Sequence, residues 1–148
     1  MSATVLHVAL FAELDAHTLY SLLRLRSDVF VVEQQCAYPD LDGRDLEPET
    51  RHVWYTEPHS DEPLAYLRLL SDVDGSVRIG RVVTAKAARG EGLSRQLLSA
   101  ALDLLPIGTP TVLDAQSYLV DFYASLGFTP TGPEYVEDGI PHVPMRRG

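Results

Sequence analysis

The chain has 148 residues, of which 45% are hydrophobic and 22% charged, a composition typical of one globular domain. Its formal net charge of −9 argues against a nucleic-acid partner, because binding to phosphates along DNA or RNA depends on positive charge. No apolar run approaches the roughly 20 residues that span a bilayer, and no secretory signal is recognisable. We therefore expect a cytoplasmic protein without a membrane partner. The single cysteine, Cys36, excludes an internal disulfide and is interpreted as a packed side chain.

The first third of the sequence predicts a strand, a helix and an acidic loop. Residues 4–11 are apolar enough for a strand, and Asp15 is a suitable N-cap for a helix that reaches about residue 30. The buried face of this helix is predicted from Leu19, Leu22, Leu23, Val29 and Phe30. The stretch that follows contains five acidic residues between prolines and a glycine: Asp40, Asp42, Asp45, Glu47 and Glu49. It does not satisfy the spacing of an EF-hand calcium loop, it could attract a cationic acceptor, and a solvated loop is the favoured interpretation.

The remaining sequence alternates strand and helix signals. Apolar and β-branched runs predict strands over 51–57, 63–70, 76–84 and 111–115, with a hairpin turn at 72–75. Leucines at helical spacing predict helices over 93–105 and 117–126, and an extended tail begins at residue 128. Residues 76–115 can form one right-handed strand–helix–strand crossover. The order predicts one α/β (α+β) domain over residues 1–148, with helices packed on a mixed sheet.

Two glycines, Gly90 and Gly92, stand where a strand gives way to a helix. They could form a tight turn, or they could let backbone N–H groups at the helix N-terminus approach a phosphate. Arg89 and Arg95 could add charged hydrogen bonds to such a phosphate. A P-loop fits poorly because the lysine and serine or threonine that should follow the second glycine are missing, and the glycine spacing does not fit a dinucleotide fold.

Two sequence elements together resemble the GNAT superfamily of N-acetyltransferases. In "RGEGLSRQLL", Arg89 and Gly92 match the family's acyl-CoA pyrophosphate loop, and Ser94 takes its last small position. Downstream, "DFYASLGF" resembles the family's "FY…GF" element. The segments "VFVVEQQCAYPDLDGRD" and "YVEDGIPHVPM", with the one around His52, extend the resemblance to the ElaA-like branch. The resemblance implies a mostly antiparallel central sheet, flanked by helices and splayed at the acyl-CoA site.

The resemblance also implies a reaction and the residues that perform it. Acetyl-CoA is the expected donor, and a primary amine is the expected acceptor, attacking directly without a covalent enzyme intermediate. A backbone N–H near Val83 would stabilise the oxyanion, and Tyr123 would protonate the leaving thiolate, since the pKa values of a phenol and a thiol are comparable. The residues expected to hold the cofactor are Val82, Val83 and Thr84 along the strand edge, Arg89, Gly90, Glu91, Gly92, Leu93, Ser94 and Arg95 at the loop, and Gln116 and Tyr123.

The general base is less well specified by the sequence. Glu33 at the end of the first helix is ranked first, and His52, His142 or a water chain are alternatives. The histidines and the cysteine lack metal-ligand spacing, so no metal is expected. Two other functions stay open: an acyl-CoA-binding module without turnover, and, ranked low, an enzyme acting on nucleotide phosphates. A homodimer is also left open.

Overall fold

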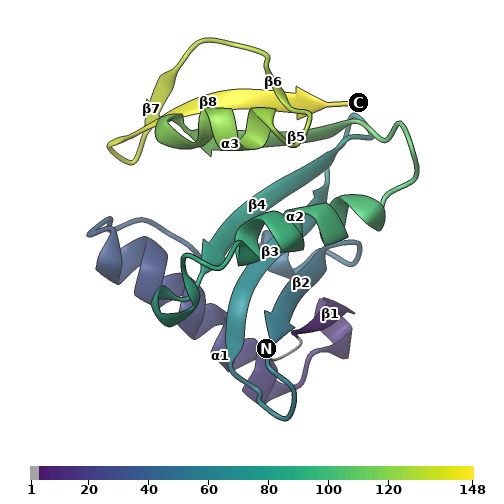
Figure 1. The fold of residues 1–148 in the computed structure, drawn as a ribbon, viewed down its shortest axis with the longest axis vertical. Coiled ribbons are helices and arrows are strands. Elements are labelled where there is room, and N and C mark those ends of the chain that lie inside the picture. Colours follow the sequence, from purple (N-terminus) through teal and green to yellow (C-terminus); the bar gives the residue numbers. More distant parts are fainter. Residues whose placement is uncertain (1–3) are drawn as a thin grey trace.

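Residues 4–148 are described by a computed structural model, in which the strands join one mixed sheet (Figure 1). The order across the sheet is β1-β2-β3-β4-β5-β8-β6, and β7 also pairs with β8. All pairs are antiparallel except β4 with β5. The strands are β1 (Val5–Leu10), β2 (Arg51–Thr56), β3 (Pro63–Ser71), β4 (Val77–Thr84), β5 (Thr111–Gln116), β6 (Thr129–Pro130), β7 (Tyr135–Glu137) and β8 (Ile140–Arg147).

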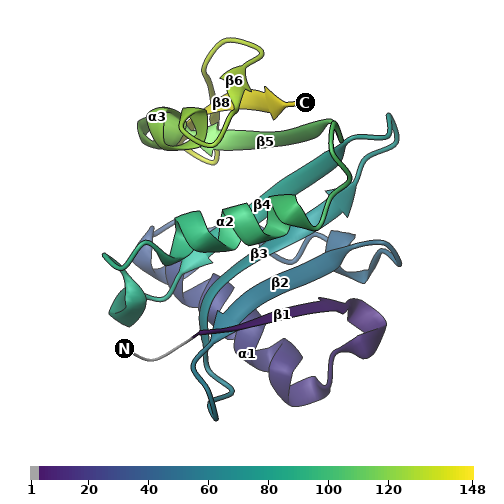
Figure 2. The same ribbon diagram turned by 45° about the vertical axis from the view of Figure 1, so that its right-hand side comes forward.

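Helices cover both faces of the sheet (Figure 2). Two apolar clusters lie between the helices and the sheet. The helix α1 packs on one face, where Leu22 and Leu25 meet Trp54 and Tyr66. On the other face α2 buries its leucines against the sheet and α3. The helices are α1 (Ala16–Arg26), the π-helix η2 (Ser27–Glu33), α2 (Leu93–Asp103), α3 (Val120–Ala124) and the short 3₁₀ turns η1 (Phe11–Glu13), η3 (Arg44–Leu46), η4 (Lys86–Ala88) and η5 (Ser117–Leu119). Within residues 4–148 no helix is long and apolar enough to cross a membrane.

The predicted fold class and all of the predicted strands up to residue 116 are confirmed, and three details differ. The first helix changes to π geometry after Arg26, where Gln34 N–H bonds to Val29 O, five residues back, at 3.0 Å. The helix predicted over 117–126 consists of η5 and the short α3. The tail forms β6, β7 and β8 rather than one extended segment, because a turn at Asp138 and Gly139, both with positive φ, reverses the chain.

The strands β4 and β5 separate almost as soon as they pair. Their parallel ladder consists of Val77 with Thr111 and Arg78 with Val112. Arg78 also joins the strands through its side chain, whose Nη1 lies 2.7 Å from Asp114 Oδ2. Beyond this point β4 continues to Thr84 beside β3 only, while β5 is held by β8 over its whole length. The predicted splay of the sheet is therefore present, and it divides the sheet into two walls.

The prediction that the acidic stretch is a solvated loop is wrong, because Asp40 and Asp45 are buried among arginines and Asp42 is paired with Arg68. The guanidinium of Arg26, 1% exposed, lies 3.1 Å from Asp40 Oδ2 and 2.7 Å from Asp45 Oδ1. Arg68, 3% exposed, bonds to Asp42 and Asp45. Burial alone would raise the pKa values of Asp42 and Asp45, but hydrogen bonds and charge from these arginines hold both below the usual range. The apolar periodicity missed this network because Arg26 occupies a buried helix position.

Removing Arg26 should destabilise the protein strongly. We expect Arg26→Ala to lower the free energy of unfolding by about 3–5 kcal/mol, because it leaves Asp40 and Asp45 buried without this partner. The matched control is Arg24→Ala on the same helix, whose side chain is 66% exposed and makes one ion pair with Asp28. Its expected loss is below about 1 kcal/mol. Urea denaturation of both variants measures the difference, and equal losses would contradict the prediction.

Candidate acyl-CoA site

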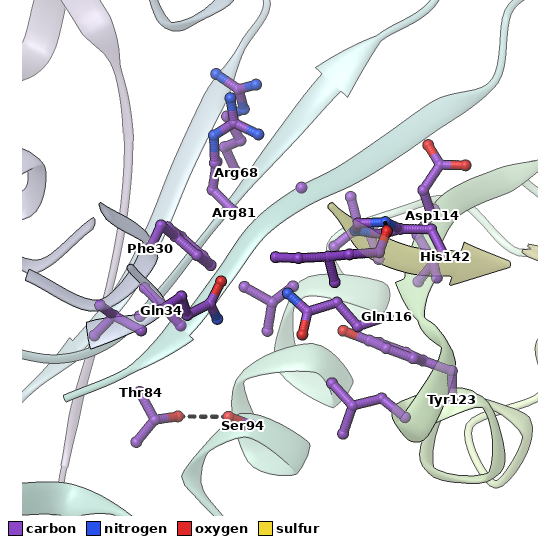
Figure 3. Close-up of a pocket in the computed structure, with 18 of the residues that line it drawn as sticks. Phe30, Gln34, Arg68, Arg81, Thr84, Ser94, Asp114, Gln116, Tyr123 and His142 are labelled. Atoms are coloured by element: carbon purple, nitrogen blue, oxygen red, sulfur yellow. Dashed lines mark hydrogen bonds between the residues drawn. The ribbon is translucent and has the colours of Figure 1, made fainter. Parts of the chain in front are cut away.

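A cavity of about 1010 Å³ lies where β4 and β5 separate (Figure 3). One wall is β4 with the loop that leads into α2, and the other is β5, α3 and the β7–β8 hairpin. The π-helix contributes Phe30 and Glu33 to the first wall, and the next residue, Gln34, also lines it. All of the residues predicted to hold the cofactor line this cavity except Glu91. Residues that are distant in the sequence thus meet where β4 and β5 separate.

The glycine loop presents a row of unused backbone donors. Gly90 and Gly92 have φ values of 83° and 75°, and Gly92 is the N-cap of α2. The first helical hydrogen bond is donated by Gln96 N–H to Gly92 O at 3.1 Å. Within residues 4–148, no protein acceptor is found for the N–H groups of residues 90–95. A Cβ at either glycine would meet no protein atom within 4 Å, so this helix N-terminus has room for an anion.

The edge of β4 that faces away from β3 has no strand partner beyond Arg78 within residues 4–148. Here the chain contains a β-bulge, since Arg81 and Val82 both lie opposite Leu67 and Arg81 has a φ of 54°. The residues after the bulge, Val82, Val83 and Thr84, run along the cavity. The open edge offers peptide groups to an extended ligand, as a neighbouring strand would.

Tyr123 and Gln116 lie on the other wall, and Figure 3 shows the Tyr123 hydroxyl pointing toward the Gln116 amide in the cavity. Tyr123 is 6% exposed, and its ring contacts Phe122 and Phe128 edge to face. Burial, together with the nearby Tyr118, raises the pKa of Tyr123 to about 12. A phenol is protonated at neutral pH even without this shift, and the higher pKa makes Tyr123 a weaker acid.

His142 is the histidine that faces this cavity. It lies opposite Gln116 in the β5–β8 ladder and stacks on Tyr135. Its Nδ1 lies 2.8 Å from Ile140 O, and a carbonyl can only accept, so Nδ1 carries a proton. In the neutral ring Nε2 is then the basic nitrogen.

Glu33, ranked first as the base, is engaged elsewhere in the structure. Arg89 donates to it through both terminal nitrogens, with Nη1–Oε2 at 2.6 Å and Nη2–Oε1 at 2.9 Å. The hydrogen bonds from Arg89 lower the pKa of Glu33, which makes it a weaker base. Its role as base stays a prediction, which this contact disfavours.

His52 lies outside the cavity and has a structural environment. It is 2% exposed and lies between Tyr66 Oη, 2.7 Å from Nδ1, and Asp45 O, 3.2 Å from Nε2. The carbonyl requires a proton on Nε2, so Nδ1 accepts from Tyr66. Burial lowers the pKa of His52 and keeps the ring neutral. Among residues 4–148, no three histidine, cysteine or acidic side chains converge as metal ligands.

Comparison with known proteins assigns the family. A family model described as "Acetyltransferase (GNAT) domain" matches residues 28–147. The chain belongs to the GNAT acetyltransferase family. ElaA of Escherichia coli is 45% identical over 92% of this GNAT chain and 91% of its own, and its crystal structure superposes with a TM-score of 0.91. A UPF0039 protein of Mycobacterium tuberculosis is 52% identical over 91% of the chain and 87% of its own.

A solved structure connects this GNAT chain with acyl transfer. The protein described as an acyl-CoA N-acyltransferase from Pseudomonas aeruginosa is 43% identical, covers 99% of this chain and 100% of its own, and has a TM-score of 0.91. The family and this fold support acyl-CoA-dependent acyl transfer.

The burial of His52 predicts a pH dependence of stability. The pKa of His52 is near 6.5 in the unfolded chain and lower in the folded protein. Between these two pKa values the unfolded chain binds more protons than the folded protein does. The contribution of His52 is complete above about pH 6.5 and is lost as the pH falls toward the folded pKa. We expect the free energy of unfolding to fall less between pH 7.5 and about 5.5 in His52→Gln than in the wild type. The exposed His17 supplies the control, His17→Gln, which should follow the wild-type curve in urea titrations.

Proposed function

We propose that the protein is an acetyl-CoA-dependent N-acetyltransferase that moves the acetyl group to a primary amine by direct attack. The observation that carries the proposal is the row of free N–H groups at residues 90–95, in the same cavity as the open edge of β4 and the phenol of Tyr123. An acyl-CoA has the matching parts in the same order: a pyrophosphate, an amide-bearing pantetheine arm and a thioester.

The first wall would bind and orient the donor. The N–H groups of residues 90–95 would bind the pyrophosphate, assisted by the dipole of α2. The edge formed by Val82, Val83 and Thr84 would pair with the pantetheine amides. An N–H near Val83 would stabilise the oxyanion that forms as the amine attacks the thioester carbonyl.

Side chains of the second wall would transfer the protons of the reaction. Tyr123, which like any phenol is protonated at neutral pH, would donate to the thiolate as the carbon–sulfur bond breaks. His142 is better oriented than Glu33 to accept the proton from the attacking amine, directly or through water, because its Nε2 is the free basic nitrogen. Gln116 lies between these two residues on the same wall, where it would help to hold the cofactor.

A module that binds acyl-CoA without turnover is the alternative. Both functions need the glycine loop and the β4 edge, but only the enzyme needs a buried acid and a base on the opposite wall. The presence of Tyr123 and His142 in the cavity favours the enzyme.

Substitution at Gly92 tests the binding of the cofactor. Gly92→Val should weaken acetyl-CoA binding at least tenfold, because a β-branched side chain at this φ strains the loop and enters the space next to the free N–H groups. The matched control is Gly108→Val, a loop position with a φ of 84° and equally open surroundings that lies outside the cavity. Titration calorimetry should show acetyl-CoA and CoA binding to the wild type and to Gly108→Val. ATP in their place should give no heat, and absent binding of acetyl-CoA to the wild type would refute the proposal.

Substitution at Tyr123 tests turnover separately from binding. Tyr123→Phe should leave the Kd of acetyl-CoA within about twofold and lower kcat by roughly 10²-fold or more, as expected for loss of a general acid. Thiol release with a panel of primary amines measures kcat, and Tyr20→Phe, 70% exposed on α1, controls for loss of a phenol. An unchanged kcat would assign Tyr123 to the core alone, and no turnover by the wild type with intact binding would favour the binding module.

A further inference from the structure

The side chains of Glu33 and Arg89 connect two parts of the site that are 56 positions apart in the sequence. Glu33 ends the π-helix, which also supplies Phe30 to the cavity, and Gln34 follows it along the cavity wall. Arg89 immediately precedes the glycine loop. The two carboxylate oxygens face the two terminal nitrogens at 2.6 and 2.9 Å, a paired geometry that fixes direction as well as distance.

Arg89 is held at a third point. Its Nε donates to Thr84 O at 3.2 Å, where β4 ends. The guanidinium thus joins the end of the open strand edge, the start of the glycine loop and the π-helix. Its hydrogen bonds are directed to Thr84 and Glu33, so it acts on the loop as a brace.

We infer that Glu33 is a positioning residue for acyl-CoA, which acts through Arg89 by fixing the glycine loop against the end of β4. This inference rests on the proposed function, since it concerns the same cofactor site. It assigns to Glu33 a part in donor binding, in place of the proton transfer that the sequence predicts for it.

The alternative roles of Glu33 give different results. If Glu33 positions the loop for donor binding, its loss raises the Kd of the donor and leaves kcat nearly unchanged. A general base acts on the amine, so its loss lowers kcat and leaves the Kd unchanged. A carboxylate that merely competes with the pyrophosphate for Arg89 would, when removed, tighten binding.

The experiment compares acetyl-CoA binding by calorimetry in Glu33→Gln, Glu33→Asp, Arg89→Ala and the double variant Glu33→Gln/Arg89→Ala. The aspartate keeps the charge but is one methylene too short for the paired contact, so it separates charge from reach. We expect the Kd to rise roughly fivefold in each Glu33 variant and at least as much in Arg89→Ala, which also loses the contact with Thr84. The double variant should bind no more weakly than Arg89→Ala, because without Arg89 the Glu33 side chain has no contact left to lose. The control is Asp28→Asn, which breaks an exposed ion pair of the same π-helix with Arg24 and should leave the Kd unchanged.

Melting temperatures, measured in parallel, separate a local effect from unfolding. Both side chains are about 40% exposed, so all of the variants should melt within a few degrees of the wild type. With the amine that gives the fastest turnover, KM for acetyl-CoA should rise as the Kd does, and kcat should stay within about twofold. An unchanged or lower Kd in Glu33→Gln, or a large loss of kcat at constant Kd, would overturn the inference. A wild type that fails to bind acetyl-CoA would refute the proposed function first.

Discussion

The site depends on the early separation of two neighbouring strands. After two paired positions β4 and β5 diverge, and each must satisfy its backbone elsewhere: β4 through β3, and β5 through β8. On the side of β4 that faces the opening, the peptide groups lack a strand partner. In most buried strands these groups are paired, because an unpaired buried peptide group costs free energy. The cavity lies in this gap. The unused donors of the glycine loop are on one wall, and the phenol of Tyr123 and the imidazole of His142 are on the other. A longer β4–β5 ladder would close the gap.

Ion pairs connect β4, in the first wall of the gap, and the neighbouring elements to the acidic stretch. Arg26 and Arg68 connect α1, the acidic stretch and β3, and Arg81, in the bulge of β4, lies 2.8 Å from Asp40. Asp40, Asp42 and Asp45 are therefore paired with arginines, which leaves these three carboxylates less charge to attract a cationic acceptor. The net charge of −9 therefore does not by itself describe the charge at the site.

Features that depend on a few neighbouring residues can be predicted from the sequence. The helix α2, its glycine N-terminus and the strand–helix–strand crossover follow from periodicity and backbone freedom over a few residues. The "FY…GF" element predicts the place of Tyr123 only by resemblance. The ion pair of Glu33 with Arg89 and the alignment of His142 with Gln116 depend on contacts between distant segments, which no local pattern encodes. Arg26 was missed for a related reason, because a buried arginine is predicted only when its buried carboxylate partners are known.

The pairing of β5 with β8 also has a consequence for biosynthesis. The strand β8, Ile140–Arg147, pairs with every residue of β5, which shares two positions with β4. The ribosome makes β8 after β1 to β5, so a nascent chain can assemble the sheet from β1 to β4 while the second wall still lacks its main support. The cavity can therefore form only after β8 has been made, and a chain truncated before β8 lacks His142 together with the strand that holds β5 in place.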